Sequence, residues 1–156
     1  MMSIQSMLRG QTLFQSLTPN QVNRIEAFST MRQCLAGDSV HRAGDEATHV
    51  YLLVEGRIHL RLPSSKNINV MIAQVGTGEL FGMSSLLGSP RHTVTAVCDT
   101  PCSVLQIEAK SLLGVLDEDA RTGLHIIRGV ARAYFDRYVG VTRRLQSIVD
   151  QIPIAH

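Results

Sequence analysis

The sequence predicts a mainly β fold with flanking helices, in which a roll or barrel of short strands lies between two helical ends. Apolar residues recur at helical spacing before residue 30, and short β-rich runs alternate with turn residues over residues 31–107. A long stripe of apolar residues at steps of three and four then follows, over about 119–152. The chain has 156 residues, 44% of them apolar, which is enough for one domain with a core of its own.

Residues 1–30 are predicted to form an N-terminal helical segment. Thr18 is a suitable N-cap, and Pro19 suits the first helical position because an N–H there would have no intrahelical partner. Val22 and Ile25 follow at helical spacing. We therefore expect a short capped helix before the first strand.

Residues 31–107 are predicted to form the β-roll core. Gly-Asp pairs at 37–38 and 44–45 mark turns, and a later run alternates polar and apolar residues as a half-buried strand does. A polar loop at 63–67 separates this run from the next one. The expected strands cover residues 39–41, 50–54, 57–62, 68–75, 93–97 and 103–107.

The last two of these runs are predicted to pair as an antiparallel hairpin across the turn 98–102. Cys98 and Cys102 flank that turn, and Cys34 is the third cysteine. No second cysteine pair completes a zinc site, so we expect reduced thiols. An odd number of cysteines also differs from the disulfide framework of a small secreted protein.

The C-terminal part, residues 108–156, is predicted to hold a short helix and then a long one over about 119–152. The stripe on the long helix exceeds what one small roll can cover, so we expect a parallel homodimer through it. The alternative is that the stripe packs only on its own domain. A second apolar set is left for contact with the roll, namely Val130, Phe135 and Val149. The residues predicted for the dimer interface are Leu124, Ile127, Ala131, Tyr134, Tyr138, Val141, Leu145 and Ile148.

The segment 78–96 is predicted to bind an anion. Gly82 opens a turn, and the residues from Met83 to Leu87 can form one helical turn whose first N–H groups have no intrahelical partner. Arg91 follows and supplies a positive charge with a planar fork of donors.

Several motifs together resemble the cyclic-nucleotide-binding domain family, the sensor module of the catabolite activator protein and FNR-like (Crp/Fnr) regulators. Phe81-Gly82, Leu86-Leu87 and Pro90-Arg91 match the phosphate-binding cassette of that family. The two Gly-Asp pairs and the Tyr-x-x-Val-x-Gly-x-Ile-x-Leu run from Tyr51 extend the resemblance over nearly the whole chain. The resemblance implies a double-stranded, jelly-roll-like β-roll whose C-terminal helix forms the dimer axis and closes over the ligand.

The cassette departs from the family pattern at one position. Met83 stands where the family has a Glu that holds the ribose hydroxyl, and the span to Arg91 is one residue shorter. The resemblance implies that Arg91 pairs with a cyclic phosphate, while ribose recognition lacks its carboxylate. The ligand-binding residues that we expect are Gly82, Met83, Ser84, Ser85, Arg91, His92 and Thr93.

The six histidines and the arginines of the long helix show no functional spacing. The histidines, among them His41, are expected to be surface or hydrogen-bonded residues, except His92, which could donate to an anion beside Arg91. The arginines lie all around the helix and indicate a solvated face. They are Arg128, Arg132, Arg137, Arg143 and Arg144.

These features predict a stand-alone regulatory sensor that binds cAMP, cGMP or another small anionic ligand and signals to a downstream partner. One alternative is a ligand-free interaction and dimerisation domain. Another is the sensor half of a Crp/Fnr-type transcription regulator without its DNA-binding part, tuned to a gas or haem. We expect no enzyme, no catalytic residue, no cofactor and no metal, because no nucleophile–base pair or ligand cluster has a recognisable spacing.

Charge and hydropathy limit the partners and the cellular location that we expect. The net charge is only +2, and no helix-turn-helix follows Pro153, so we expect no direct DNA binding. No apolar run approaches the ~20 residues of a membrane span. The N-terminus lacks the pattern of a signal peptide. We expect a cytoplasmic protein.

Overall fold

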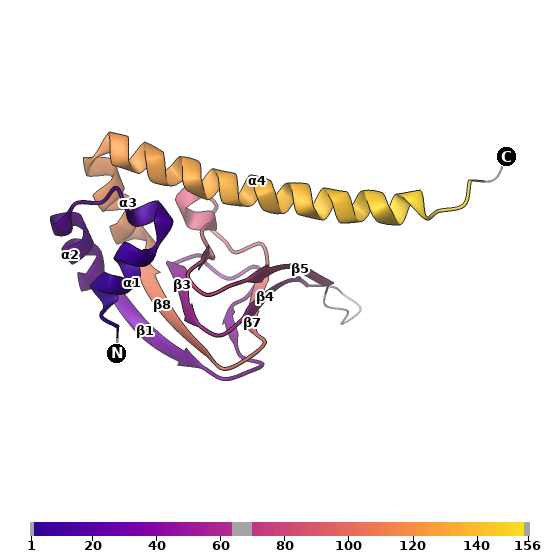
Figure 1. Cartoon of the computed structure of the whole chain (residues 1–156), viewed down its shortest axis with the longest axis horizontal. Coiled ribbons are helices and arrows are strands. Elements are labelled where there is room, and N and C mark those ends of the chain that lie inside the picture. The colour runs from indigo at the N-terminus through magenta and orange to yellow at the C-terminus, as the bar shows by residue number, and fades with distance from the viewer. Residues whose placement is uncertain (1, 64–69, 155–156) are drawn as a thin grey trace.

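Two antiparallel sheets pack face to face to form the roll, with helices at one end and along one side (Figure 1). The computed structural model describes residues 2–63 and 70–154. Its strands are β1 (Ser29–Cys34), β2 (Ser39–His41), β3 (His49–Glu55), β4 (Ile58–Leu62), β5 (Val70–Val75), β6 (Leu80–Phe81), β7 (Thr95–Cys98) and β8 (Cys102–Glu108). One sheet has the order β1-β8-β3-β6 and the other the order β2-β7-β4-β5. The predicted fold class is therefore confirmed, while the predicted loop at 63–67 lies almost entirely outside the described residues.

The N-terminal segment is helical as predicted. It contains α1 (Ile4–Gly10), the 3-10 helix η1 (Thr12–Phe14) and α2 (Pro19–Ala27). Thr18 caps α2 through a capping box: its Oγ1 accepts from the Gln21 N–H at 3.2 Å, and its own N–H donates to Gln21 Oε1 at 2.8 Å. Val22 and Ile25 are buried, which confirms the face predicted from their spacing.

The core consists of two layers because the strands alternate their side chains. Val50 and Leu52 of β3 face the helices, whereas Tyr51 and Leu53 face the opposite sheet, so this strand is buried on both sides. Such a strand is a nearly continuous apolar run, as the sequence of β3 is.

The predicted hairpin of 93–97 with 103–107 is wrong. β7 pairs with β2 and β4, whereas β8 pairs with β1 and β3 in the other sheet. The turn between them therefore carries the chain from one sheet to the other. Its composition signals a reversal, but it does not specify which sheet receives the next strand.

The three cysteines are free and buried in the layer between the sheets. Cys34 lies opposite Cys102 across β1 and β8. Burial, reinforced by the neighbouring thiol of Cys102, raises the pKa of Cys98 to about 12. The Cys98 thiol is therefore protonated at neutral pH, and all three cysteine side chains pack as small apolar groups.

The C-terminal part contains α3 (Ala109–Glu118) and the long helix α4 (Ala120–Asp150). Asp119 caps α4 by accepting from the Thr122 N–H at 3.2 Å. Along the roll, α4 buries Ile126 and Val130 completely, and it then projects past the sheets (Figure 1). Arg144 connects the helix to β5 through hydrogen bonds. Its guanidinium donates to the carbonyl oxygen of Met71 at 3.3 Å and to that of Ile72. None of the helices in the described residues has an apolar stretch long enough to cross a membrane.

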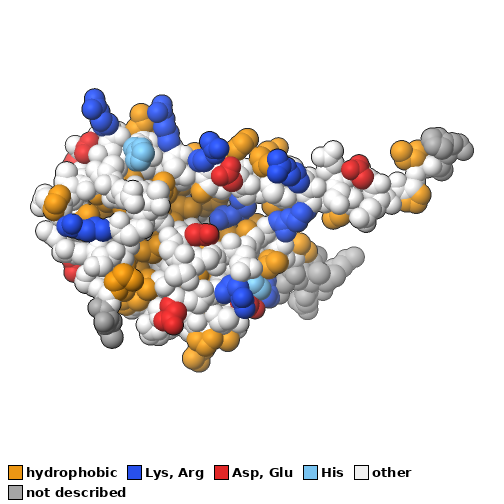
Figure 2. All heavy atoms as spheres, viewed as in Figure 1, with side chains coloured by type: hydrophobic (Ala, Val, Ile, Leu, Met, Phe, Trp, Pro, Cys, Tyr) orange, Lys and Arg blue, Asp and Glu red, His pale blue; other side chains and the backbone are white. Residues whose placement is uncertain are grey.

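The faces of α4 differ in part from the prediction. Val130 meets the core as expected, but Phe135 and Val149 are 57% and 53% exposed, so that part of the prediction is wrong. Ile127 and Tyr134, which were expected at a dimer interface, instead pack partly buried against the domain's own core. Figure 2 shows separate apolar side chains along α4 between charged ones. The exposed apolar residues of the helix, which we call the outer stripe, are Leu124, Phe135, Tyr138, Leu145, Ile148 and Val149.

Candidate ligand site

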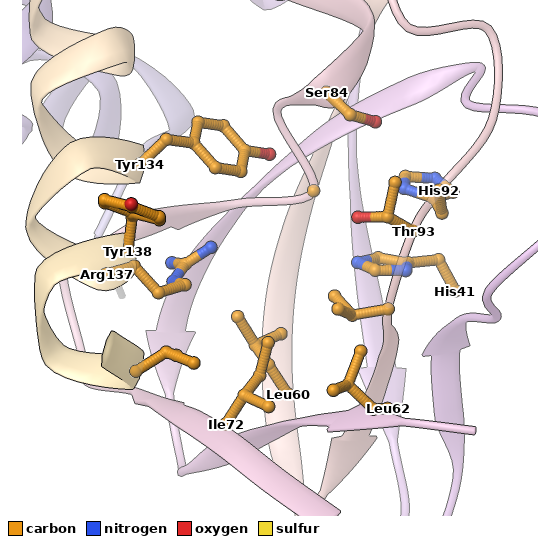
Figure 3. A pocket seen from close by; sticks show the side chains of 13 residues that line it. His41, Leu60, Leu62, Ile72, Ser84, His92, Thr93, Tyr134, Arg137 and Tyr138 are labelled. Atoms are coloured by element: carbon orange, nitrogen blue, oxygen red, sulfur yellow. The ribbon is translucent and has the colours of Figure 1, made fainter. Parts of the chain in front are cut away.

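A cavity of about 340 Å³ lies between the β2-β7-β4-β5 sheet, the cassette and α4. Figure 3 shows side chains from the roll and from α4 facing each other across it. The lining residues are His41, Leu60, Leu62, Ile72, Gly82, Ser84, His92, Thr93, Val94, Tyr134, Arg137, Tyr138 and Val141.

The cassette enters the cavity wall through Gly82. This residue has a φ of +64°, and a Cβ built on it would lie 2.7 Å from Tyr51 Cδ2 and 3.1 Å from His41 Cδ2. Only glycine allows both the left-handed backbone and this close approach. The 3-10 helix η2 (Ser84–Leu87) follows after Met83, and Gly88 is its C-cap. The single helical turn predicted here is therefore present, in 3-10 form.

Two stacked histidines form one wall. His41 ends β2 and His92 lies just beyond the cassette helix, and their ring centroids are 3.8 Å apart with an interplanar angle of 11°. Both residues are at most 5% exposed. Burial, and secondarily the charge of His92, lowers the pKa of His41 to about 3, with a smaller opposing effect from the Val94 backbone. Burial also lowers the pKa of His92, which Asp45 partly opposes.

The His41 ring is therefore neutral at pH 7, with one N–H donor and one acceptor nitrogen. Within the described part of the chain, neither nitrogen has a hydrogen-bond partner of acceptable geometry. His41 lines the cavity, but both of its ring nitrogens are buried, so a ligand would reach them only after the ring shifts.

The opposite wall is the middle of α4. Burial raises the pKa of the Tyr134 hydroxyl, and the Arg137 guanidinium lies 5.4 Å from the Tyr134 ring centroid, within range of a cation–π interaction. No carboxylate is among the lining residues, and Arg137 forms no ion pair within the described ranges. Arg137 is thus an uncompensated positive charge beside the cavity.

The structure gathers four of the seven predicted ligand residues at the cavity: Gly82, Ser84, His92 and Thr93. The other three lie elsewhere. Met83 is 2% exposed and packs in the helical layer of the core. Ser85 lines a separate groove beside Glu46 and Lys110 on the outside of the roll.

Arg91 also lies outside the cavity lining. Its Nη1 donates to the Gly44 carbonyl oxygen at 2.8 Å, and its backbone bridges to Glu46. Successive residues of an extended segment point to opposite faces, so a cassette one residue shorter exchanges inward and outward positions. His92 is the inward residue here and Arg91 the exposed one.

Sequence analysis missed two polar groups of the site, His41 and Arg137. Both were interpreted as surface or solvated residues because neither belongs to a motif. Tyr134, Tyr138 and Val141 were assigned only to a dimer interface, yet they line the cavity. Helical spacing alone predicts a shared face but not which neighbour covers it.

The family model described as cyclic nucleotide-binding domain matches residues 31–119, more than half of the chain. The chain is 28% identical over 138 residues to glutaminase 2 of Bradyrhizobium diazoefficiens, covering 88% of this chain and 21% of that protein. It is 28% identical over 112 residues to the cyclic AMP receptor protein of Thermus thermophilus, covering 72% and 48%. The chain therefore spans about a fifth and about half of these relatives. A solved structure, a putative cyclic nucleotide-binding protein from Geobacter metallireducens, superposes with a TM-score of 0.74 at 28% identity, covering 88% and 99%.

Proposed function

Because this chain belongs to the cyclic nucleotide-binding domain family, we propose that it is a regulatory sensor that binds a small anionic ligand in the cavity. The observation that carries this proposal is that the roll and α4 both line the cavity. A ligand there would contact His41 and His92 on one side and Arg137 on the other. Its presence would change how firmly α4 is held, which makes α4 the output element.

Arg137 is our candidate for the anion partner. It is the single Lys or Arg among the lining residues that the structure describes, and its guanidinium offers a fork of donors to a phosphate or carboxylate. Ser84, Thr93 and His92 supply further hydrogen-bonding groups. For Arg91 to take this role, as the family resemblance implies, its guanidinium would have to leave the Gly44 carbonyl and turn inward.

Hydrogen–deuterium exchange with millimolar cAMP or cGMP tests the site. We expect slower exchange around Ser84 and in residues 134–141 together, lost in Arg137→Gln and retained in Arg91→Ala. Loss of a charge-assisted hydrogen bond costs about 1.5–3 kcal/mol, or roughly a tenfold to hundredfold loss of affinity. Protection that survives Arg137→Gln and disappears in Arg91→Ala would return the anion to Arg91. No change with either nucleotide would contradict cyclic-nucleotide sensing.

We also propose that the domain forms a homodimer through α4. The exposed apolar positions Leu124, Phe135, Tyr138, Leu145 and Val149 follow one another at steps that fit a heptad pattern. Leu145→Glu should dissociate the dimer in analytical ultracentrifugation. Gln146→Glu adds the same charge beside the stripe and should leave the dimer intact. An unchanged mass for Leu145→Glu would contradict this interface.

For the whole protein, we propose a regulatory rather than a catalytic role. The relatives named above are an enzyme and a receptor protein, each with more chain than this domain covers. A domain that signals through one helix can act on a joined effector or on a separate partner. The sensor half of a transcription regulator remains the second candidate.

A further inference from the structure

The cavity surface is mostly apolar. Leu60, Leu62 and Ile72 form its floor. Val94, which directly precedes β7, and Val141 of α4 add further apolar surface. The tyrosines of α4 present aromatic rings as well. A ligand gains affinity here by burying apolar surface area, because removing that area from water contributes favourable free energy to binding.

In residues 2–63 and 70–154, one charged group faces this apolar surface. Arg137 reaches the cavity from α4, and Figure 3 shows it on the side opposite His41. The histidine pair does not add a second charge at neutral pH, since burial keeps both rings neutral. The lining therefore matches a ligand with a single negative charge.

The ring of His41 lies at the other end. The residue is 5% exposed, and its two ring nitrogens are buried without hydrogen-bond partners in the described ranges. Leu60 and Ile72 lie along the floor between Arg137 and His41 (Figure 3). The polar groups thus stand at two ends of an apolar trough.

We propose that the ligand of this cavity is a mostly apolar monocarboxylic acid, with its carboxylate on Arg137, its body on the floor of Leu60, Leu62 and Ile72, and its far end against His41. This inference rests on the proposed function, that the cavity is the ligand site. It narrows the ligand class and separates it from cyclic nucleotides.

The lining explains the preference over a cyclic nucleotide. Among the described residues the lining offers no carboxylate to a ribose hydroxyl, only neutral hydroxyl and imidazole groups, and Met83 packs in the core. A neutral acceptor holds a hydroxyl less tightly than a carboxylate does, by roughly tenfold in affinity. An apolar body needs no such acceptor.

A thermal-shift and calorimetric comparison of matched ligands tests the inference. The probes are octanoate, cinnamate and naphthoate, each paired with its primary amide, and cAMP. We expect at least one acid to bind roughly tenfold or more tighter than its amide and than cAMP. Arg137→Gln should remove the advantage of the acid over the amide, and Arg91→Ala, the matched control, should retain it. NMR should show shifts of the His41 and His92 ring signals on binding.

The outcomes separate the inference from the proposed function. Tighter binding of cAMP than of every acid, with α4 protected, overturns the ligand class and leaves the sensor function standing. Equal binding of acid and amide, or no effect of Arg137→Gln, overturns the role of Arg137. If neither the acids nor cAMP bind to folded protein at millimolar concentration, the inference and the sensor function both fail.

Discussion

Acidification should destabilise the folded domain because His41 is buried in a neutral state. Its pKa is lowered from 6.5 to about 3 in the fold. Between these two values the unfolded chain binds a proton that the folded chain does not, so stability rises with pH in this window and is lost as the pH falls below 6.5. His92, with its own lowered pKa, acts in the same direction.

The magnitude follows from the width of that window. Each pH unit inside it changes the free energy of unfolding by about 1.4 kcal/mol, so lowering the pH from about 7.5 to about 5 costs about 2 kcal/mol through His41 alone. The titratable groups against the pair are Asp45, whose charge opposes the lowering of the His92 pKa, and Tyr51, whose ring stacks on His41. The capping and ion-paired carboxyls Glu118 and Asp119 have lowered pKa values, so their contribution is lost only at lower pH.

Urea unfolding at the two pH values measures this effect. His41→Leu should remove about 2 kcal/mol of the pH dependence. The control His125→Gln changes an exposed histidine of α4 and should keep the full dependence. If His41→Leu does not fold, His41→Gln serves the same purpose. A His41 variant with the same pH dependence as the wild type would refute the reasoning.

Three further predictions concern stability and can be checked by urea unfolding at neutral pH. Gly82→Ala forces a Cβ to within 2.7 Å of Tyr51 at a φ of +64°, so we expect a loss of about 1–3 kcal/mol, and a loss near zero would show that the wall can relax. Gly140→Ala adds a methyl group in open space within α4 and should stabilise the fold by about 1 kcal/mol, whereas a loss would indicate a contact there. Thr18→Ala removes the capping box of α2 and should cost about 1 kcal/mol, and an unchanged midpoint would mean that the cap is dispensable.

Local signals predicted the elements of this fold well. The Thr18-Pro19 cap, the Gly-Asp turns and the apolar spacing of the long helix each depend on neighbours in sequence, and the corresponding elements are present. These signals could be identified because the energetics of caps, turns and periodic faces are largely local.

The features that we did not predict depend on contacts between residues far apart in the sequence. The partner of β8 is chosen by the far strands β1 and β3, so the turn at 98–102 could not reveal it. The inward position of His92 in place of Arg91 follows from a single-residue difference in the cassette. His41 belongs to the site because the roll brings β2 beside the cassette, and Arg137 because α4 crosses the cavity.

The most direct test of the account is a crystal structure of the domain with bound cinnamate. The account predicts the carboxylate at the Arg137 guanidinium, the ring over Leu60 and Ile72, and its far end against His41. Ligand density at Arg91 with an empty cavity would contradict it.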